Sequence, residues 1–285
     1  MAAGVTLRHA LDQAARKLQL AGIERARAEA RLLAGHALGV AMEQVVGSDA
    51  RILSRHQADA IERLVQLREA RRPMAQVLGY REFYGRRFAV TADVLTPRPD
   101  SETLIDAVLQ RVPERSAALE ILELGVGSGC LLLSLLAELP LARGTGIEIS
   151  PEALVVAGAN AEALGLADRV ALQAGDWSAA ANGRFDVIVS NPPYIPRAEI
   201  AALEPEVARY EPALALDGGE DGLDYYRRLG LDLGRLLAPD GFVALEVGRG
   251  QADDVAAILV ASGIGTIERQ RDLGGIERCV LAARP

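Results

Sequence analysis

The sequence predicts an α/β protein: a class I, Rossmann-like sheet of seven strands, preceded by a small all-α domain and a β-hairpin. Three observations predict it. Residues 1–75 place apolar side chains at helical spacing, residues 76–95 gather aromatic residues around a turn, and residues 96–285 alternate strand-like with helix-like segments. Because such alternation forms a mostly parallel, doubly wound sheet, we expect ligands at the carboxyl ends of its strands.

The first domain is expected to hold three main helices. Thr6 is a candidate N-cap for a helix that ends at Gly22, and a second helix is expected over residues 24–37. A third begins at Ser54 and stops before Pro73. The apolar stripes of these helices are most simply a small core, and a domain that docks a partner is the functional interpretation of the same pattern.

The remaining elements follow in alternation. A hairpin is expected between Gly79 and Val94, where four of the ten Phe and Tyr residues lie. Strands are expected near residues 118–124, 144–149, 170–174, 185–190, 242–247, 264–270 and 277–282. Helices are expected over 130–139, after an N-cap at Ser150, and over 223–238 before a turn at 239–241. The last two strands are close enough in sequence to form an antiparallel pair.

Histidine and lysine are missing from the larger domain. All three histidines lie within the first 56 residues, and Lys17 is the only lysine. This absence excludes Ser-His-Asp catalysis, histidine-ligated metals, P-loop lysines and Schiff bases there. Cys130 and Cys279 are isolated, so neither a zinc site nor a disulfide is indicated. We expect no metal, and chemistry that depends on carboxylates, amides, aromatic rings and a cofactor.

The net charge of −8 is unevenly distributed along the chain. Residues 1–75 carry 12 Lys and Arg against 8 Asp and Glu, whereas residues 76–285 carry 19 against 31. An acidic larger domain argues against DNA binding, which requires neutralising several phosphates. No apolar run approaches the ~20 residues that cross a bilayer, and residues 1–8 lack the apolar core of a secretion signal. We therefore expect a cytoplasmic protein away from membranes, and nothing requires more than a monomer.

A glycine-rich turn joins the first strand of the larger domain to a helix. Glycines at alternate positions let the backbone turn tightly and approach a ligand closely. The spacing is GxGxG and not the GxGxxG of dinucleotide-binding proteins, so the helix N-terminus need not receive a pyrophosphate. The candidate cofactor-binding residues of this turn are Glu123, Gly125, Val126, Gly127, Ser128 and Gly129.

Residues at the ends of the next two strands complete the outline of a nucleoside site. Glu148 ends the second strand, about 20 residues after the turn, where a carboxylate can accept hydrogen bonds from ribose hydroxyls. Asp176 and Trp177, the only tryptophan, follow the third strand. An acid beside a large ring suits an adenine, although filling the core is an equal alternative for Trp177. Together these residues predict S-adenosylmethionine across the strand ends.

Asn191-Pro192-Pro193-Tyr194 follows the fourth strand and is the most informative motif in the chain. A carboxamide or aromatic amine nitrogen is a weak nucleophile because its lone pair is delocalised. The Asn191 side-chain oxygen and the Pro192 carbonyl can accept its two N–H bonds and direct the lone pair at a methyl group, while Tyr194 stacks on the flat group. We predict Asn191, Pro192 and Tyr194 as catalytic, Pro193 as an added substrate contact, and Asn191 as a cofactor contact too.

These residues resemble the glutamine-N5 methyltransferases that modify peptide chain release factors, the HemK/PrmC family. The resemblance covers nearly the whole chain. Its most discriminating segment is Thr96-Pro97-Arg98-Pro99-Asp100-Ser101-Glu102-Thr103, where related ribosomal-protein methyltransferases differ. Further similar segments are 80–85, 190–195, 210–216 and 272–278. The family usually has Thr at the position of Val126, and Asp is also common at that of Glu148.

The resemblance implies an activity and a separate role for each domain. The methyl group of S-adenosylmethionine would pass to the glutamine of a Gly-Gly-Gln loop in a release factor. Residues 1–75 would help to grip that factor, and residues 96–285 would form the methyltransferase domain. By position, Gly125–Gly129, Glu148, Trp177 and Asn191 would hold the cofactor, and Asn191–Tyr194 would hold the glutamine.

Other activities remain open at this point. The nearest is the same reaction on a ribosomal protein, followed by adenine-N6 methylation of DNA or RNA, for which a similar Pro-Pro-Tyr edge is suited. The acidic larger domain weighs against a nucleic acid. A cofactor-binding protein without chemistry would leave the intact Asn191–Tyr194 motif unexplained, and so would a dinucleotide oxidoreductase.

Overall fold

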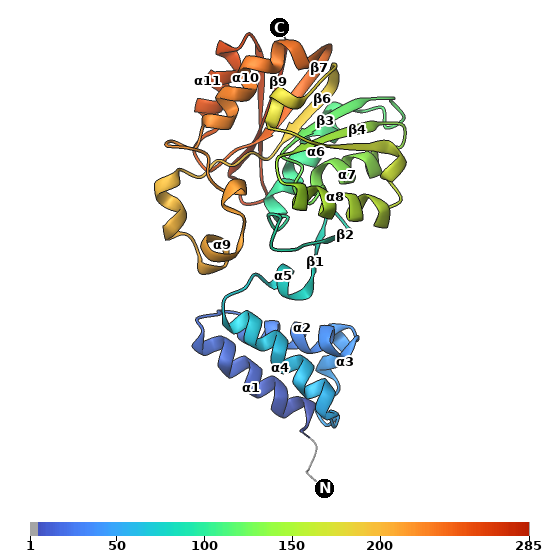
Figure 1. Ribbon diagram of the computed structural model, residues 1–285, viewed down its shortest axis with the longest axis vertical. Helices are drawn as coiled ribbons and strands as arrows, with labels where there is room; N and C mark the ends of the chain where they lie inside the picture. The colour runs from blue at the N-terminus through green and yellow to red at the C-terminus, as the bar shows by residue number, and fades with distance from the viewer. Residues whose placement is uncertain (1–4, 285) are drawn as a thin grey trace. The chain divides into compact units, whose positions relative to one another are not determined.

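The computed structural model describes residues 5–284, which form two compact units (Figure 1). The helical unit comprises the chain up to Gly79 together with Glu204–Tyr210, and the sheet unit comprises Tyr80–Leu203 and the chain from Glu211 onward. The division at Gly79 lies between the boundaries expected at residues 75 and 95. Residues 1–4, on which part of the secretion-signal expectation rests, are outside the described residues. No helix within residues 5–284 is long and apolar enough to span a bilayer.

The helical unit contains the three helices that its apolar stripes predict: α1 (Leu7–Leu20), α2 (Ala26–Leu38) and α4 (Arg55–Glu69). Both predicted N-caps are confirmed. The Thr6 hydroxyl accepts a hydrogen bond from the His9 backbone N–H, and the Ser54 hydroxyl accepts one from Gln57. Apolar side chains of all three helices meet in one buried cluster.

Three further helices of this unit were not predicted: α3 (Met42–Val46), α5 (Met74–Leu78) and α9 (Pro205–Tyr210). They are too short for their sequences to show a helical period. The α9 segment leaves the sheet unit after Leu203 and returns to it at Glu211. Two arginines of the helical unit hold α9: Arg68 Nη1 donates to Glu206 Oε1 at 2.8 Å, and Arg71 Nη2 donates to Glu206 Oε2 at 2.6 Å.

The sheet unit is built on seven strands in the order β5-β4-β3-β6-β7-β9-β8. Their bounds are β3 (Glu120–Leu124), β4 (Arg143–Glu148), β5 (Val170–Ala174), β6 (Phe185–Ser190), β7 (Leu237–Glu246), β8 (Thr266–Arg271) and β9 (Glu277–Ala283). The first five strands pair in parallel, and β9 pairs antiparallel with β7 and β8. The expected hairpin is formed by β1 (Tyr80–Phe83) and β2 (Arg86–Ala89). The predicted seven-stranded, doubly wound sheet is confirmed.

Helices cover both faces of this sheet (Figure 1). On one face lie α6 (Glu102–Arg111), α7 (Cys130–Glu138) and α8 (Pro151–Ala163), and on the other lie α10 (Asp224–Leu236) and α11 (Ala252–Ala261). Successive strand residues alternate between the two buried clusters, as Ile121 and Leu122 do. Because both faces are buried, most residues of the central strands β3 and β6 are apolar, as in parallel strands between two helical layers.

Two boundaries differ from the prediction, and α6 and α11 were not predicted. Helix α10 ends at Leu236, and β7 begins at Leu237, so the turn expected at residues 239–241 lies within a strand. There the pairing with β6 shifts register after Phe185. A Cβ at Gly241 would stand 2.8 Å from the Phe185 carbonyl oxygen, so glycine permits this close approach. Residues 238–241 have no partner in β6, so Pro-Asp-Gly forms an irregularity within β7 and does not separate β7 from α10.

Candidate active site

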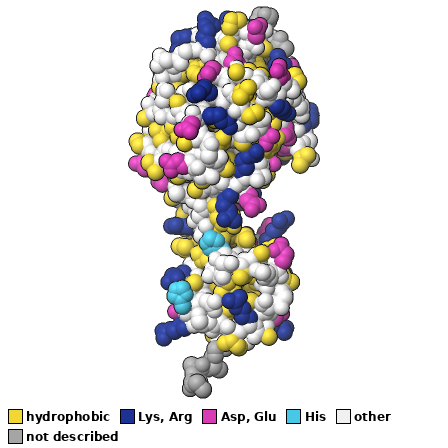
Figure 2. Space-filling model, turned by 90° about the vertical axis from the view of Figure 1, so that its right-hand side faces the viewer, with side chains coloured by type: hydrophobic (Ala, Val, Ile, Leu, Met, Phe, Trp, Pro, Cys, Tyr) yellow, Lys and Arg dark blue, Asp and Glu magenta, His cyan; other side chains and the backbone are white. Residues whose placement is uncertain are grey.

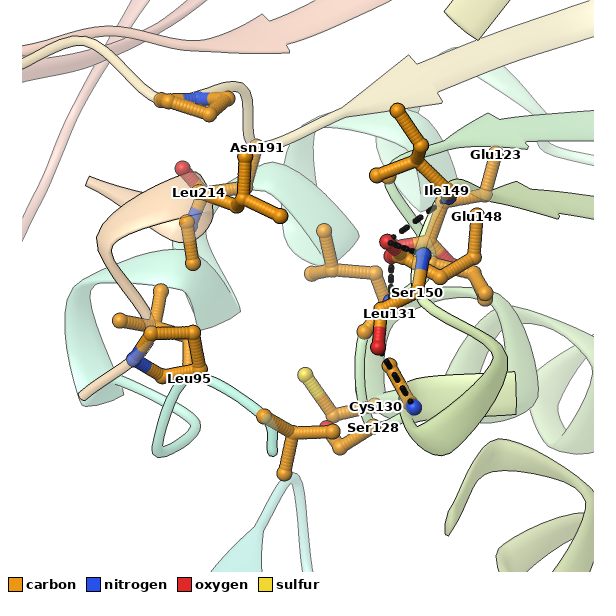
Figure 3. A pocket seen from close by; sticks show the side chains of 18 of the residues that line it. Leu95, Glu123, Ser128, Cys130, Leu131, Glu148, Ile149, Ser150, Asn191 and Leu214 are labelled. Atoms are coloured by element: carbon orange, nitrogen blue, oxygen red, sulfur yellow. Dashed lines mark hydrogen bonds between the residues drawn. The ribbon is translucent and has the colours of Figure 1, made fainter. Parts of the chain in front are cut away.

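A cavity of about 290 Å³ opens at the carboxyl ends of the central strands (Figure 3). The strand order reverses there, because β4 lies on one side of β3 and β6 on the other. Ligands of doubly wound sheets bind at such a reversal. Every predicted cofactor residue lines the cavity except Gly129, which is the N-cap of α7. Of the predicted substrate residues, Asn191 and Pro193 line it, and Pro192 and Tyr194 do not.

The glycine-rich turn has the conformation that its sequence predicts. Gly125, Gly127 and Gly129 all have positive φ, at 72°, 51° and 79°. A Cβ at Gly125 would stand 3.0 Å from the Trp177 ring. The positive φ and the nearby ring therefore both disfavour a side chain at this position. The buried side chain of Asn160 holds the far end of the turn by donating to the Ser128 carbonyl at 2.8 Å.

Glu148 joins the end of β4 to the glycine-rich turn. Its Oε2 accepts from the Gly127 backbone N–H at 2.9 Å, and its Oε1 accepts from Ile149 and Ser150 at 2.9 and 3.1 Å (Figure 3). A carboxylate offers about four lone-pair sites, so acceptor capacity is left for a ligand in the cavity. The carboxylate therefore orients the turn and can also accept ribose hydroxyls.

Glu123 lies deeper in the same wall. It is 2% exposed, and its Oε2 accepts from the Leu132 backbone N–H at 3.0 Å, in the first turn of α7. Burial raises the pKa of Glu123 well above its usual value, and the nearby Glu148 charge acts in the same direction.

Trp177 and Asp176 follow β5, where the sequence places them. The Trp177 ring is buried and packs on Tyr225 with the ring centroids 4.8 Å apart, and its backbone has a positive φ of 56°, which is uncommon for a bulky residue. Its Nε1–H has no hydrogen-bond partner within residues 5–284. Asp176 is exposed and pairs with Arg228 at 2.8 Å. Trp177 is thus part of the core and of the cavity wall at once.

Asn191 is held at the cavity by a residue that sequence reasoning missed. Its Nδ2 donates to the hydroxyl of Ser101 at 3.3 Å, and its Oδ1 has no partner among the residues that the structure describes. Tyr194, at the other end of the motif, places its hydroxyl 3.5 Å from Glu246 Oε1. Burial raises the pKa of Tyr194, so its phenol stays protonated. The motif is therefore bonded at both ends to side chains from distant parts of the sequence.

Two segments that carried the family resemblance also line the cavity. Arg98 lines the cavity beside Thr96 and Pro97, and Pro212 and Leu214 line it from the other segment. An ion pair joins them, with Arg98 Nη2 2.5 Å from Glu211 Oε2. The resemblance identified both segments, but no sequence spacing shows that they meet. Within residues 5–284, no group of three or more His, Cys, Asp or Glu side chains is placed to hold a metal ion.

Comparison with known proteins identifies the family. A model of the PrmC N-terminal domain matches residues 9–79, and a model of the methyltransferase small domain matches residues 100–207. A release factor glutamine methyltransferase of Rhodospirillum rubrum is 52% identical over 274 residues, or 96% of this chain and 84% of the relative. The chain belongs to the release factor glutamine methyltransferase family. Another member, from Caulobacter vibrioides, is 42% identical over 98% of this chain and 97% of its own length.

Solved structures support the fold of this release factor glutamine methyltransferase family member. The catalytic domain of human Mettl16, crystallised with a MAT2A 3′UTR hairpin, superposes with a TM-score of 0.60 at 15% identity, over 74% of this chain and 81% of that one. A methyltransferase from Pyrococcus furiosus gives a TM-score of 0.51 at 18% identity, over 70% and 89%. These likenesses confirm the predicted methyltransferase fold and no more than the fold.

Proposed function

We propose that this protein transfers the methyl group of S-adenosylmethionine to the side-chain N5 of the glutamine in the Gly-Gly-Gln motif of peptide chain release factors. The observation that carries the proposal is the shared cavity. Figure 3 shows Asn191 across it from Glu148, so a residue suited to an amide and one suited to a ribose face the same space. Membership of the release factor glutamine methyltransferase family supplies the substrate class.

The residues of the cavity fit the cofactor. The turn over residues 125–128 exposes backbone to the cavity, Glu148 retains acceptor capacity for ribose hydroxyls, and the Trp177 ring offers a flat apolar face. Asp176, exposed at the rim, is proposed to meet the polar edge of the adenine. When bound, the cofactor supplies a methyl group on a positively charged sulfur, which is already reactive toward a weak nucleophile.

The chain's own contribution is to orient the glutamine amide. Asn191 Oδ1 and the Pro192 carbonyl would accept its two N–H bonds, which turns the nitrogen lone pair toward the methyl group. Pro193 and Tyr194 would complete the substrate contacts, with the Tyr194 ring against the flat amide. Holding two reactants in this way can supply about 7–11 kcal/mol of the barrier reduction. No histidine or lysine is needed in the sheet unit, because the N-protonated product loses its proton readily to water.

The helical unit is proposed to grip the release factor, since it matches the PrmC N-terminal domain. A protein substrate is also consistent with the surface of the sheet unit, where acidic and basic side chains are interspersed on the face shown in Figure 2. We propose that nucleic acid is not a direct partner, that the enzyme acts as a monomer, and that it works in the cytoplasm with the translation apparatus.

The proposal is tested by labelling. The purified protein is incubated with methyl-labelled S-adenosylmethionine and a purified release factor, and in parallel with ribosomal proteins, DNA and RNA. We expect label on the release factor and none when its Gly-Gly-Gln glutamine is replaced by alanine. Label on a ribosomal protein or nucleic acid instead would overturn the substrate while leaving the fold and cofactor in place.

A further inference from the structure

Arg98 is the only positively charged side chain among the described residues that line the cavity. Four acidic side chains line it as well, those of Asp93, Glu123, Glu148 and Asp176. None of the roles proposed for the cofactor or for the glutamine amide uses Arg98, although an arginine offers five N–H donors in a fixed plane. Its contacts indicate what those donors can bind.

A buried carboxylate holds one part of the Arg98 guanidinium. Arg98 Nη2 donates to Glu211 Oε2 at 2.5 Å, and the Glu211 side chain is only 1% exposed. An ionised carboxyl group buried to this extent is costly unless it is paired, so Arg98 stabilises Glu211 in place. The Arg98 side chain is itself 37% exposed. The pair is therefore asymmetric, with a buried carboxylate and an accessible cation at the cavity.

Most of the Arg98 donors have no partner. The bond to Glu211 is the only side-chain hydrogen bond of Arg98 within residues 5–284. The nitrogens Nη1 and Nε are thus available to a ligand in the cavity. Because the guanidinium is planar and one of its nitrogens is held, the remaining N–H groups point in fixed directions, which suits an oxygen acceptor.

Two prolines restrict the backbone from which Arg98 projects. Pro97 precedes it and Pro99 follows it, and Arg98 has the extended conformation, with φ −96° and ψ 137°, that a following proline favours. The Arg98 carbonyl accepts from the Ser101 backbone N–H at 3.1 Å, which closes a tight turn. The Ser101 hydroxyl in turn accepts from Asn191 Nδ2. Arg98 is therefore fixed in the same turn that contacts the proposed amide-binding residue.

Arg98 belongs to the part of the cavity proposed for the substrate. Figure 3 shows Leu95 and Leu214, one from each of the two segments that the ion pair joins. Both lie on the Asn191 side, across the cavity from Glu148. The free donors of Arg98 thus lie where the glutamine would enter and not where the ribose would bind.

The chemistry of the proposed substrate determines which oxygen suits Arg98. A cation on the side-chain oxygen of the glutamine would draw the nitrogen lone pair further into the carbonyl and slow methyl transfer. The two glycines of Gly-Gly-Gln have no side chains, so only their backbone groups can be recognised, and a backbone carbonyl is a neutral acceptor with two lone pairs. An arginine that is already paired with a carboxylate suits such a neutral acceptor better than a second carboxylate.

We propose that Arg98 binds backbone carbonyl oxygens of the Gly-Gly-Gln segment, and that Glu211 is the positioning residue that orients Arg98. The inference rests on the proposed function and deepens it, because it adds a residue that recognises the substrate backbone to those that hold the target amide. A backbone hydrogen bond is made equally before and during methyl transfer, so Arg98 contributes to substrate binding and little to kcat.

The first test compares Arg98→Ala with the wild-type protein at saturating S-adenosylmethionine. We expect KM for the release factor to rise by about tenfold or more, as for loss of a hydrogen bond to a charged group, with kcat nearly unchanged. The dissociation constant of S-adenosylmethionine should keep its wild-type value. A raised dissociation constant with an unchanged KM would assign Arg98 to the cofactor and overturn the proposal.

A double variant separates lost recognition from lost folding. Arg98→Ala leaves Glu211 buried and unpaired, which is destabilising by itself. Combining Arg98→Ala with Glu211→Gln removes that charge, and we expect KM to stay as high as in Arg98→Ala alone. A KM restored to the wild-type value in the double variant would show that the unpaired carboxylate caused the defect, and the proposal would fail.

Arg86→Ala is the matched control. Arg86 is also a partly exposed arginine of the sheet unit that pairs with a glutamate, Glu138, at 2.7 Å, and it does not line the cavity. We expect this variant to keep the wild-type KM. An equal rise of KM in Arg86→Ala and Arg98→Ala would show a general loss of charge and not a contact in the cavity.

A binding measurement identifies the group that Arg98 contacts. Titration calorimetry, with S-adenosylhomocysteine as the demethylated cofactor, gives the dissociation constant of the release factor for the wild-type protein and for Arg98→Ala. Replacing the Gly-Gly-Gln glutamine by alanine removes its side-chain amide and keeps the backbone carbonyls. The effect of Arg98→Ala should therefore persist with the altered factor. An effect that disappears would place Arg98 on the glutamine side chain and contradict the proposal.

The labelled substrate separates the role of Arg98 from the proposed function. If the wild-type protein labels a release factor and Arg98→Ala has the same KM, the role of Arg98 fails and the proposed function stands. If it labels a ribosomal protein instead, the proposed substrate fails, and a raised KM of Arg98→Ala for that protein still supports a contact with peptide backbone. Label only on DNA or RNA would overturn both, since a nucleic acid has no peptide carbonyl.

Discussion

Asn191 is a residue whose proposed role depends on one atom. Its Nδ2 is committed to Ser101, and its Oδ1 is without a partner within residues 5–284. A free carbonyl oxygen on a fixed side chain is a preorganised acceptor, which needs no rearrangement when the target amide arrives. The prolines that follow limit the backbone around it.

Asn191→Ala should therefore lower kcat by about 10²–10³-fold, the usual effect of removing one preorganised group at a transition state. Cofactor affinity should change little, and calorimetry alongside single-turnover rates separates the two effects. Asn182→Ala is the control, because Asn182 lies on an exposed loop and its side chain bonds only the nearby Ala180 carbonyl. An unchanged rate in Asn191→Ala would remove it from the catalytic residues.

Glu148 has two functions at one carboxylate. It holds the Gly127 backbone N–H, and it is proposed to accept the ribose hydroxyls. Glu148→Ala should weaken S-adenosylmethionine binding by about ten- to a hundredfold, since hydrogen bonds to a charged group contribute about 1.5–3 kcal/mol. Titration calorimetry measures the dissociation constant of S-adenosylmethionine. Glu152→Ala, on the surface of α8, is the control. A wild-type dissociation constant in Glu148→Ala would place the ribose elsewhere.

At the scale of elements, the Trp177 ring restricts which side chains fit in the turn between β3 and α7. Gly125→Ala places a methyl group 3.0 Å from the Trp177 ring, in addition to the strain of a positive φ. We expect a marked loss of cofactor affinity. Gly39→Ala is the control, because Gly39 has a similar φ of 65° but no atom within 4 Å of an added Cβ. Both variants should lose about 1 kcal/mol of stability to backbone strain, and only Gly125→Ala should bind the cofactor more weakly.

Helix α9 is held in the helical unit by charge. Arg68 is 8% exposed and pairs with Glu29 and Glu206. Burial alone would lower its pKa, but the hydrogen bonds to the two carboxylates leave the pKa raised. Arg68→Ala leaves Glu206 with its partner Arg71 only, so we expect a loss of about 3–5 kcal/mol in the free energy of unfolding.

Urea unfolding followed by circular dichroism measures that loss. The control is Arg55→Ala, which removes an ion pair with Asp59 whose side chains are 95% and 63% exposed. Such a pair contributes little, so Arg55→Ala should unfold like the wild-type protein. Equal destabilisation by the two variants would show that the buried network is no stronger than a surface pair.

At the scale of the whole molecule, the two units have separate hydrophobic cores, one in the helical unit and two against the faces of the sheet. The only tryptophan, Trp177, lies in the sheet unit and in the cavity wall. Its fluorescence therefore reports on the unfolding of one unit, whereas circular dichroism reports on both.

This arrangement allows the cofactor site to be assigned to one unit. At about 100 times its dissociation constant, S-adenosylmethionine should stabilise the folded protein by about 2.7 kcal/mol. We expect the Trp177 fluorescence transition to shift to higher temperature with the cofactor, and to stay in place in Arg68→Ala. A fluorescence transition that ignores the cofactor would place the binding site outside the sheet unit.

Local patterns were sufficient for most of the fold and for the glycine-rich turn of the candidate site. The helical stripes, the caps at Thr6 and Ser54, the strand–helix alternation and the glycine-rich turn are encoded by residues close together in sequence, so they could be predicted. The turn expected at residues 239–241 lies within β7 as a register shift, because Leu237, just before it, already pairs with Phe185 of β6, some fifty residues earlier. Short helices such as α9 escaped prediction because they contain too few residues for a period.

The partners of the predicted site residues could not be obtained from the sequence. Ser101 and Asn191 are 90 residues apart, and Glu246 is 52 residues beyond Tyr194. They meet because the parallel order of β3, β6 and β7 brings three strand ends to one edge and the Pro99–Ser101 turn packs there. Consecutive residues determine which chemical groups the chain carries, but hydrogen bonds over such separations exist only once the sheet has assembled.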